Sequence, residues 1–197
     1  MRPTIILAFL IATLAPPAAA VQYVIAPGKG NEVVFWSEAP LESFEGKTDQ
    51  ARGSVSLDWS DPAGTLEIRA AVDLASLDTG INLRNHHMRE NHLHTEEFPE
   101  AIFAADSITG LSVGEGPPAS RIECFVTGDF TLHGVTRAMT VPVTIVAREA
   151  GALEIEARFD VILSDYGIPR PKFLFLKLDE TQRVRVRLVA TPEARTK

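Results

Sequence analysis

The chain has 197 residues, of which 45% are hydrophobic and 23% are charged, with 13 Gly, 13 Pro and a single Cys. This balance is typical of a globular domain and excludes intrinsic disorder, a collagen-like repeat and a disulfide-stapled scaffold. The formal net charge is −7 and no basic block is present. The chain therefore lacks the electrostatic footprint that binding to nucleic acid, or general adhesion to anionic lipid headgroups, requires.

Residues 1–20 have the layout of a secretory signal peptide. Arg2 supplies a positive charge, residues 5–14 form an apolar run, and Ala18-Ala19-Ala20 provide the small side chains that a signal peptidase reads. The apolar run is shorter than the ~20 residues that cross a bilayer. We therefore expect cleavage after Ala20, a periplasmic or secreted location, and a single domain over residues 21–197.

From Val33 onward, apolar and polar residues alternate with a period of two, which predicts β-strands with one buried face. Turn-forming Gly, Pro and Asp separate the runs. The predicted strands lie near residues 33–37, 55–59, 66–73, 101–108, 122–132, 139–148, 153–161 and 183–188. About eight strands, several of them long, favour a closed antiparallel barrel, because an open sheet would leave long unpaired edges.

Residues 77–95 interrupt this alternation. Ile81, Leu83, Met88 and Leu93 lie among Arg, Asn, His and Glu without a two-residue period, which predicts a helix or helical turns. The sequence contains no linker, internal repeat or low-complexity tract. The expected fold is therefore all-β: one eight-stranded antiparallel barrel with a short helical insertion.

The inner positions of the predicted strands are nearly all apolar. Eight strands closed into a barrel enclose either a packed core or a small apolar ligand, and the alternation alone cannot distinguish them. The small residues at three inner positions, Ala70, Gly128 and Ala157, weakly favour a cavity. The expected lining of an apolar pore is Val55, Leu57, Trp59, Leu66, Ile68, Ala70, Val126, Phe130, Met139, Val141, Val143, Ile145, Phe159 and Val161.

Four of the five histidines, His86, His87, His92 and His94, lie within nine residues. Zinc normally requires three or four converging ligands, and these spacings do not provide them, although His92-x-His94 could chelate from one side. We therefore predict a structural or polar role for the histidines and no native metal.

The sequence offers one cysteine as a candidate nucleophile. Cys124 falls on the apolar phase of its strand, between Ile122 and Val126, so burial is expected to raise the pKa of its thiol and leave it inert. The sequence contains no nucleophile elbow, zinc-protease motif or phosphate-binding loop. We therefore predict no catalytic residue, no cofactor and no enzymatic activity.

Four segments together resemble the YceI-like family: Phe44-Glu45-Gly46, Leu77–Leu93 with Phe98–Phe103, Gly128–Arg137, and Ser164–Ile168. The resemblance covers essentially the whole chain after residue 20, and the sequence Gly-Asp-Phe-Thr-Leu-His-Gly-Val-Thr-Arg is its most specific part. It implies a lipocalin-like barrel, periplasmic or secreted, whose elongated pore binds long isoprenoid or other lipid-like chains. The chain departs from the family pattern at His86, which replaces a more usual charged residue.

The resemblance and the apolar inner face lead to the hypothesis of non-catalytic binding, carriage or storage of a long-chain isoprenoid or similar lipid, of quinone or polyprenyl type. Arg84, His87 and Arg89 are candidate headgroup contacts or lid residues, since their donors suit a phosphate or quinone oxygen. A carrier of this kind is also expected to make transient contact with a membrane or a membrane protein. The alternatives are a stress-response protein that sequesters assorted lipophiles and an accessory to a membrane redox or metal-dependent system.

Overall fold

The computed structural model describes residues 20–38, 43–114, 120–170, 172–173 and 176–194. Apart from Ala20, the predicted signal peptide lies outside these residues. The strands are β1 (Val21–Ile25), β2 (Glu32–Glu38), β3 (Ser43–Thr48), β4 (Ala51–Leu57), β5 (Glu67–Asp73), β6 (Glu100–Gly114), β7 (Arg121–Leu132), β8 (Val135–Ala147), β9 (Leu153–Ile162), β10 (Lys172–Phe173), β11 (Leu176–Lys177) and β12 (Thr181–Pro192). The helical elements are α1 (Pro62–Thr65), η1 (Leu74–Ser76), α2 (Asn82–His87), η2 (Met88–Leu93), η3 (Glu149–Gly151) and η4 (Leu163–Tyr166).

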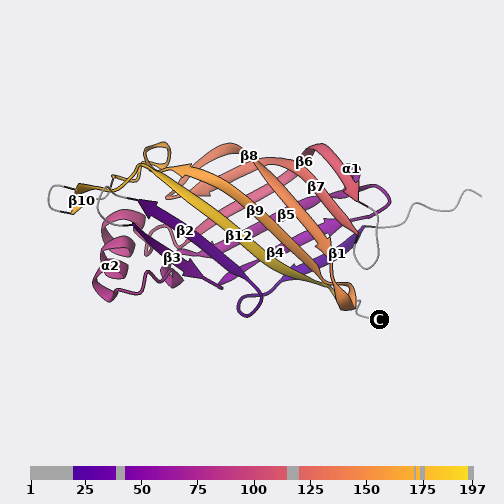
Figure 1. The fold of residues 1–197 in the computed structure, drawn as a ribbon, viewed down its shortest axis with the longest axis horizontal. Coiled ribbons are helices and arrows are strands. Elements are labelled where there is room, and N and C mark those ends of the chain that lie inside the picture. The colour runs from indigo at the N-terminus through magenta and orange to yellow at the C-terminus, as the bar shows by residue number, and fades with distance from the viewer. Residues whose placement is uncertain (1–19, 39–42, 115–119, 171, 174–175, 195–197) are drawn as a thin grey trace, which may run out of the picture.

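Eight of these strands close into a barrel (Figure 1). The ring runs β1-β4-β5-β6-β7-β8-β9-β12, and it closes because β1 pairs antiparallel with both β4 and β12. This confirms the predicted eight-stranded antiparallel barrel. The helical segment predicted over residues 77–95 is also confirmed, as α2 followed by the π-type turn of η2.

β1 and β2 lie end to end along the same neighbouring strand, β12, and the loop at Gly28-Lys29-Gly30 separates them. β1 pairs with the end of β12, and β2 pairs with its beginning, at Arg183–Arg187. Between them, the Asn31 side chain donates to the carbonyl oxygens of Ala26 (2.8 Å) and Ala51 (3.2 Å) and accepts from the Val189 amide (3.0 Å). One side chain therefore replaces the backbone pairing that the loop interrupts.

The wall is less complete at the end of the barrel where α2 lies. There β3 pairs with β2 on one side, while on the other side it meets the segment that precedes α2. Lys47 N donates to Asp78 O (3.0 Å), and Asp78 N donates to Lys47 O (2.9 Å). Figure 1 shows α2 covering this end, so the helical insertion completes the wall.

The interior divides into two hydrophobic clusters. The larger one, here called the packed half, contains Ile25, Leu57, Ile122, Ile145 and Leu153, whose side chains are at most 1% exposed. The smaller one, here called the lid half, consists of Leu74, Leu77, Phe130, Leu132, Val161, Leu163, Tyr166 and Ile168. Each half thus has its own hydrophobic core, and the most deeply buried hydrophobic side chains belong to the packed half.

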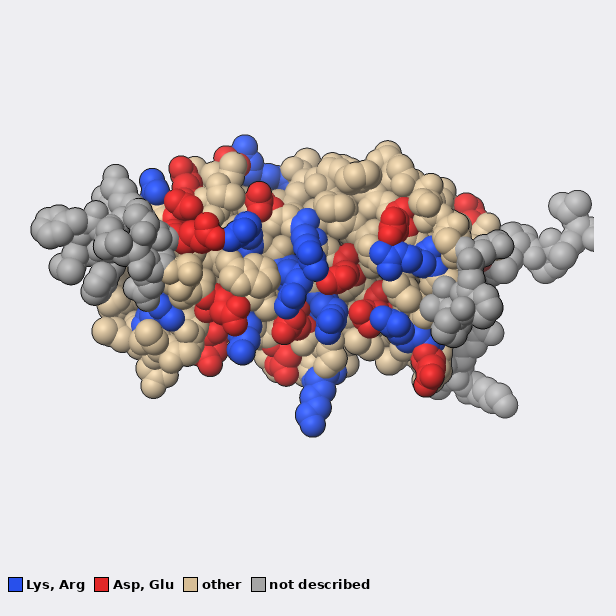
Figure 2. Space-filling view, viewed as in Figure 1, with Lys and Arg blue, Asp and Glu red and all other residues tan. Residues whose placement is uncertain are grey.

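The outer surface carries mixed charges (Figure 2). On β12, Arg183 pairs with Glu38 and Arg185 with Glu32, so outward-facing arginines are matched by carboxylates of β2. Their outward orientation confirms the predicted alternation along this strand. Among the described residues, no helix is long and apolar enough to cross a bilayer.

Candidate functional site

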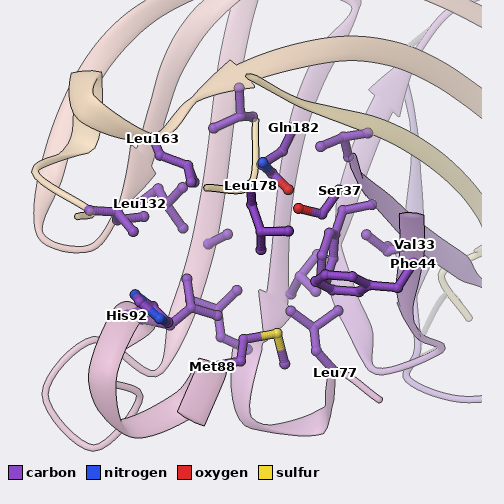
Figure 3. Close-up of a pocket in the computed structure, with 18 of the residues that line it drawn as sticks. Val33, Ser37, Phe44, Leu77, Met88, His92, Leu132, Leu163, Leu178 and Gln182 are labelled. Carbon is purple, nitrogen blue, oxygen red and sulfur yellow. The ribbon is translucent and has the colours of Figure 1, made fainter. Parts of the chain in front are cut away.

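A cavity of about 510 Å³ lies in the lid half of the barrel (Figure 3). Strands supply half of its lining residues, and η1, α2, η2, η4 and the segments that connect them to the strands supply the rest. Its lining is Val33, Phe35, Ser37, Phe44, Val72, Leu74, Leu77, Ile81, Leu83, Arg84, His87, Met88, His92, Leu93, Ala101, Phe130, Leu132, Phe159, Val161, Leu163, Ile168, Leu178, Gln182 and Val184. Most of these side chains are apolar, so the cavity favours an apolar occupant.

Two phenylalanines form one wall of the cavity. The rings of Phe35 and Phe44 meet edge to face, with their centroids 6.2 Å apart. Gly46 makes this possible, because a Cβ at that position would collide with the Phe35 ring. The Phe44-Glu45-Gly46 segment therefore shapes the cavity in two ways: Phe44 contributes its own ring to the wall, and Gly46 leaves room for the ring of Phe35.

Two polar residues of the lining, Ser37 and Gln182, are buried. Ser37 lies near the end of β2 and Gln182 near the start of β12, and Figure 3 shows their side-chain oxygens facing each other. The Gln182 amide nitrogen donates to the carbonyl oxygen of Asp179 (2.7 Å). Elsewhere in the lining, Val33 is part of the packed half and Val72 packs against it. The cavity is thus mainly apolar, with a buried polar pair on one wall.

The helical insertion is fixed to the barrel by buried hydrogen bonds. The Asn85 side-chain oxygen accepts from the Thr79 amide (2.8 Å) and hydroxyl (2.7 Å), and its nitrogen donates to Asp78 Oδ1 (2.8 Å). The bond from Asn85, with a second from the Gly80 amide, lowers the pKa of the Asp78 carboxyl below its usual value. The start of α2 therefore has a defined position over the cavity.

Two of the three predicted headgroup residues line the cavity, namely Arg84 and His87. The Arg84 guanidinium donates to the Thr79 carbonyl oxygen (2.8 Å) and lies 4.1 Å from the centroid of the Phe44 ring. Arg89 is not part of the lining. It donates to the Leu77 carbonyl oxygen (3.1 Å) and so ties η2 to the segment that precedes α2.

His92 is the second imidazole of the lining, and it is half-buried. Burial lowers the pKa of His92, and the nearby His87 and His94 lower it further, while a hydrogen bond with the Pro169 backbone acts in the opposite direction. His92 is therefore neutral at neutral pH, and it presents an imidazole rather than a cation to the cavity.

The other end of the insertion is joined to the barrel by two histidines. His133 Nδ1 lies 3.0 Å from the Tyr166 carbonyl oxygen, and His133 Nε2 lies 2.8 Å from His94 Nδ1. A carbonyl only accepts, so His133 donates from Nδ1 and accepts from His94 at Nε2. This chain connects η2, the β7–β8 turn and η4, which are three of the segments that carry the family resemblance.

The described residues contain no group of three or more His, Cys, Asp or Glu placed to hold a metal ion. The predicted lack of a native metal remains a prediction. Cys124 is 5% exposed, and burial raises the pKa of its thiol, as the sequence indicated.

Of the predicted pore-lining residues, Phe130, Phe159 and Val161 border the cavity. The others lie in the packed half or against it. Val55, Leu57, Leu66, Ile68, Val126, Val141, Val143 and Ile145 are members of that cluster, and Trp59, Ala70 and Met139 pack on it. Trp59 follows β4 in a turn rather than extending the strand.

The small inner residues Ala70, Gly128 and Ala157, which were expected to favour a cavity, do not border it either. At Gly128, a Cβ would collide with the carbonyl oxygen of Ala104 and with Ala105 on the adjacent strand. The missing side chain therefore makes room for β6 rather than for a ligand.

Many of the lining residues that the alternation did not identify lie outside the regular strands, namely Leu77, Ile81, Leu83, Met88, Leu93 and Ile168, and Phe44 lies on the short strand β3. All of these belong to the segments that resemble the YceI-like family. The useful signal was thus the concentration of apolar residues in segments without a strand period.

The fold and the cavity define a lipocalin-like antiparallel barrel with one end shaped as an apolar pocket beneath a helical cover. The YceI-like domain family matches residues 23–190, and the chain belongs to this family.

Relatives in sequence agree with this membership. The UPF0312 protein VVA0736 of Vibrio vulnificus is 30% identical over 160 residues, covering 77% of this chain and 76% of that protein. Protein YceI of Escherichia coli O6:H1 is 28% identical over 125 residues, covering 59% of each chain. The UPF0312 protein plu2095 of Photorhabdus laumondii is 35% identical over 86 residues, covering 43% of this chain and 40% of that protein. The chain thus aligns with less than two thirds of the last two proteins.

Solved structures share the fold. A polyisoprenoid binding domain from Saccharophagus degradans superposes with a TM-score of 0.67 at 19% identity, covering 88% of this chain and 99% of that one. BcnA of Burkholderia cenocepacia gives a TM-score of 0.66 at 21% identity, covering 82% and 96%. At these identities the structures establish a common barrel.

Proposed function

We propose that the protein is a non-catalytic carrier or store for an isoprenoid or similar lipid of quinone or polyprenyl type. The observation that carries this proposal is the apolar cavity of about 510 Å³ beneath the helical cover. The polyisoprenoid-binding domain of Saccharophagus degradans, which shares the fold, supports it. The expected signal peptide fits a carrier that works in the periplasm or outside the cell.

The volume limits how much of a lipid the cavity takes up. A single hydrocarbon chain fits a mainly apolar space of this kind, and a longer chain would leave its remainder outside the cavity, past Arg84 and His87, which also line it.

The energetics suit a carrier. Each buried CH₂ is favoured over water by about 0.8 kcal/mol, so about 15 of them contribute about 12 kcal/mol. A bilayer interior offers the same chain a similar gain, and exchange between membrane and cavity is therefore close to neutral. Such an exchange is reversible and needs no chemical step.

The lining also supports a non-catalytic role. Cys124 belongs to the packed half and does not border the cavity. Ser37 faces Gln182, whose carboxamide is not a base that could activate a hydroxyl.

The test is lipid mass spectrometry on protein purified from its own host. Ala101 lines the cavity, and Ala101→Phe would fill part of it, whereas Ala138→Phe places the same ring at an exposed position on β8. We expect about one lipid per wild-type chain, little in Ala101→Phe and a normal amount in Ala138→Phe. A folded Ala101→Phe protein with a full lipid load, or a wild-type protein without lipid, would refute the proposal. A mixture of unrelated lipophiles would favour the broader sequestering function.

A further inference from the structure

Among the described residues, the two most exposed large hydrophobic side chains both lie at the edge of the cavity. Leu83, the second residue of α2, is 65% exposed, and Ile81, the residue before α2, is 51% exposed. Both also line the cavity. The entrance is therefore marked by apolar groups that touch the interior space and the solvent at once.

The exposure of these two residues is built into the fold. Asn85 is buried and hydrogen-bonded to Thr79 and Asp78, and Met88 packs into the lid half on the next turn. These anchors hold one face of the helical segment against the barrel. Leu83 and Ile81 consequently remain outside while the helix stays folded.

The charges near this apolar pair are balanced. From Asp78 to Glu90 the segment carries two arginines and two carboxylates. The carboxylates are engaged within the segment, Asp78 with Asn85 (2.8 Å) and Glu90 with His86 (2.8 Å). The segment therefore sets no net charge against a headgroup layer, and the affinity of such a surface for a bilayer comes from the apolar area that its exposed side chains bury there.

We propose that Ile81 and Leu83 form a membrane-docking tip, which inserts into the surface of a lipid bilayer and places the cavity entrance against the source of the ligand. This inference rests on the proposed lipid-carrier function. The net charge of −7 gives no long-range attraction to anionic lipids, so the contact is local and brief. A brief contact suits a protein that must leave the membrane with its cargo.

The test measures transfer of cis-parinaric acid, a fluorescent single-chain lipid, from phosphatidylcholine vesicles with and without phosphatidylglycerol. The variant is Ile81→Ser combined with Leu83→Ser. The matched control is Phe125→Ser, since Phe125 is 50% exposed on the outside of β7, between the core residues Cys124 and Val126. Equilibrium uptake of the same probe added from ethanol, without vesicles, is measured in parallel.

We expect the double variant to accept probe from vesicles about tenfold more slowly than wild type, because the two lost side chains together remove at least the ~1.4 kcal/mol that a tenfold change represents. Since both side chains also line the cavity, the transfer rate of each variant is divided by its own vesicle-free uptake; this ratio should fall about tenfold in the double variant, and Phe125→Ser should behave as wild type. Wild-type transfer rates in the double variant, or equal slowing by Phe125→Ser, would overturn the docking tip. A parallel loss of vesicle-free uptake would assign the two residues to ligand binding instead.

Two further outcomes separate this inference from its premise. A wild-type protein that takes up no probe from either source would refute the lipid-carrier function itself. A wild-type dimer that becomes monomeric in the double variant, seen by light scattering, would assign the exposed pair to self-association and refute the docking tip.

Discussion

The two halves of the barrel are built from the same strands and from the same alternation, yet one is packed and the other is hollow. In the packed half, Ile25, Leu57, Ile122, Ile145 and Leu153 are at most 1% exposed and fill the interior. In the lid half, equally apolar residues surround about 510 Å³ of free space. The amount of apolar inner face therefore does not decide where a cavity forms.

The difference arises from how each half is closed. The packed half is enclosed by paired strands on all sides, and their side chains interdigitate across the barrel. In the lid half, β3 and β5 are not paired with each other, and the only β-bridge beyond β3 in the described chain joins Lys47 and Asp78. The insertion that covers this gap spans the opening without filling it, because hydrogen bonds at Asn85 and His133 hold it at the rim.

The largest expected effect comes from a charge placed in the packed half. Val143 is 5% exposed inside it, whereas the neighbouring Thr144 faces outward between Glu123 and Glu156 on the adjacent strands. Val143→Lys should cost at least about 4 kcal/mol, because an unpaired ammonium would be buried, and Thr144→Lys should be close to neutral. Chemical denaturation of the two variants measures this. A stable, fully folded Val143→Lys protein would mean that the packed half is hollow or wet.

A smaller effect should separate the two cores under one identical substitution. Leu153 is 1% exposed in the packed half, and Leu163 is 8% exposed beside the cavity. Leu153→Ala should cost about 3–4 kcal/mol, since it creates a new void, and Leu163→Ala about 1–2 kcal/mol, since its side chain already borders free space. Urea unfolding of lipid-free protein tests the difference. Equal losses would remove the contrast between the halves.

The smallest effect concerns pH and is confined to the lid half. Because burial lowers the pKa of His92, the folded state favours its neutral form, and the unfolded chain takes up a proton first as the pH falls. The stability that this provides is complete above the unfolded pKa of about 6.5 and is lost as the pH falls through the lowered value. His92→Leu should flatten the pH dependence of the urea midpoint between about pH 8 and pH 5. A His92→Leu protein that keeps the wild-type pH dependence would contradict this assignment.

The sequence predicted the barrel well because a period of two reports which side chains face inward. Positions such as Val143 and Thr144, or Val184 and Arg185, lie on the expected faces. The period does not report how far an inner side chain lies from the opposite wall, and that distance depends on barrel closure. This is why Val55 and Ile145 were expected to line a pore but belong to a packed core.

Other features depended on contacts between residues distant in the sequence. β1 and β3 were not predicted as strands, since Val21–Ile25 and Ser43–Thr48 show little clean alternation and are defined by pairing with β4 and β2. The role of Arg84 at the cavity was predicted from its chemistry, whereas the bond of Arg89 to the Leu77 carbonyl depends on how the helix turns back over the barrel.

Photo-cross-linking tests the central claim most directly, namely that a lipid occupies the lid half alone. A fatty acid with a diazirine at the end of its chain would be loaded into the protein, irradiated, and its attachment sites mapped by peptide mass spectrometry. We expect attachment at cavity residues such as Val72, Phe130 and Val161. Attachment at Val126, Val141 or Ile145 would contradict this claim, because a chain that reaches those residues must pass through the core of the packed half.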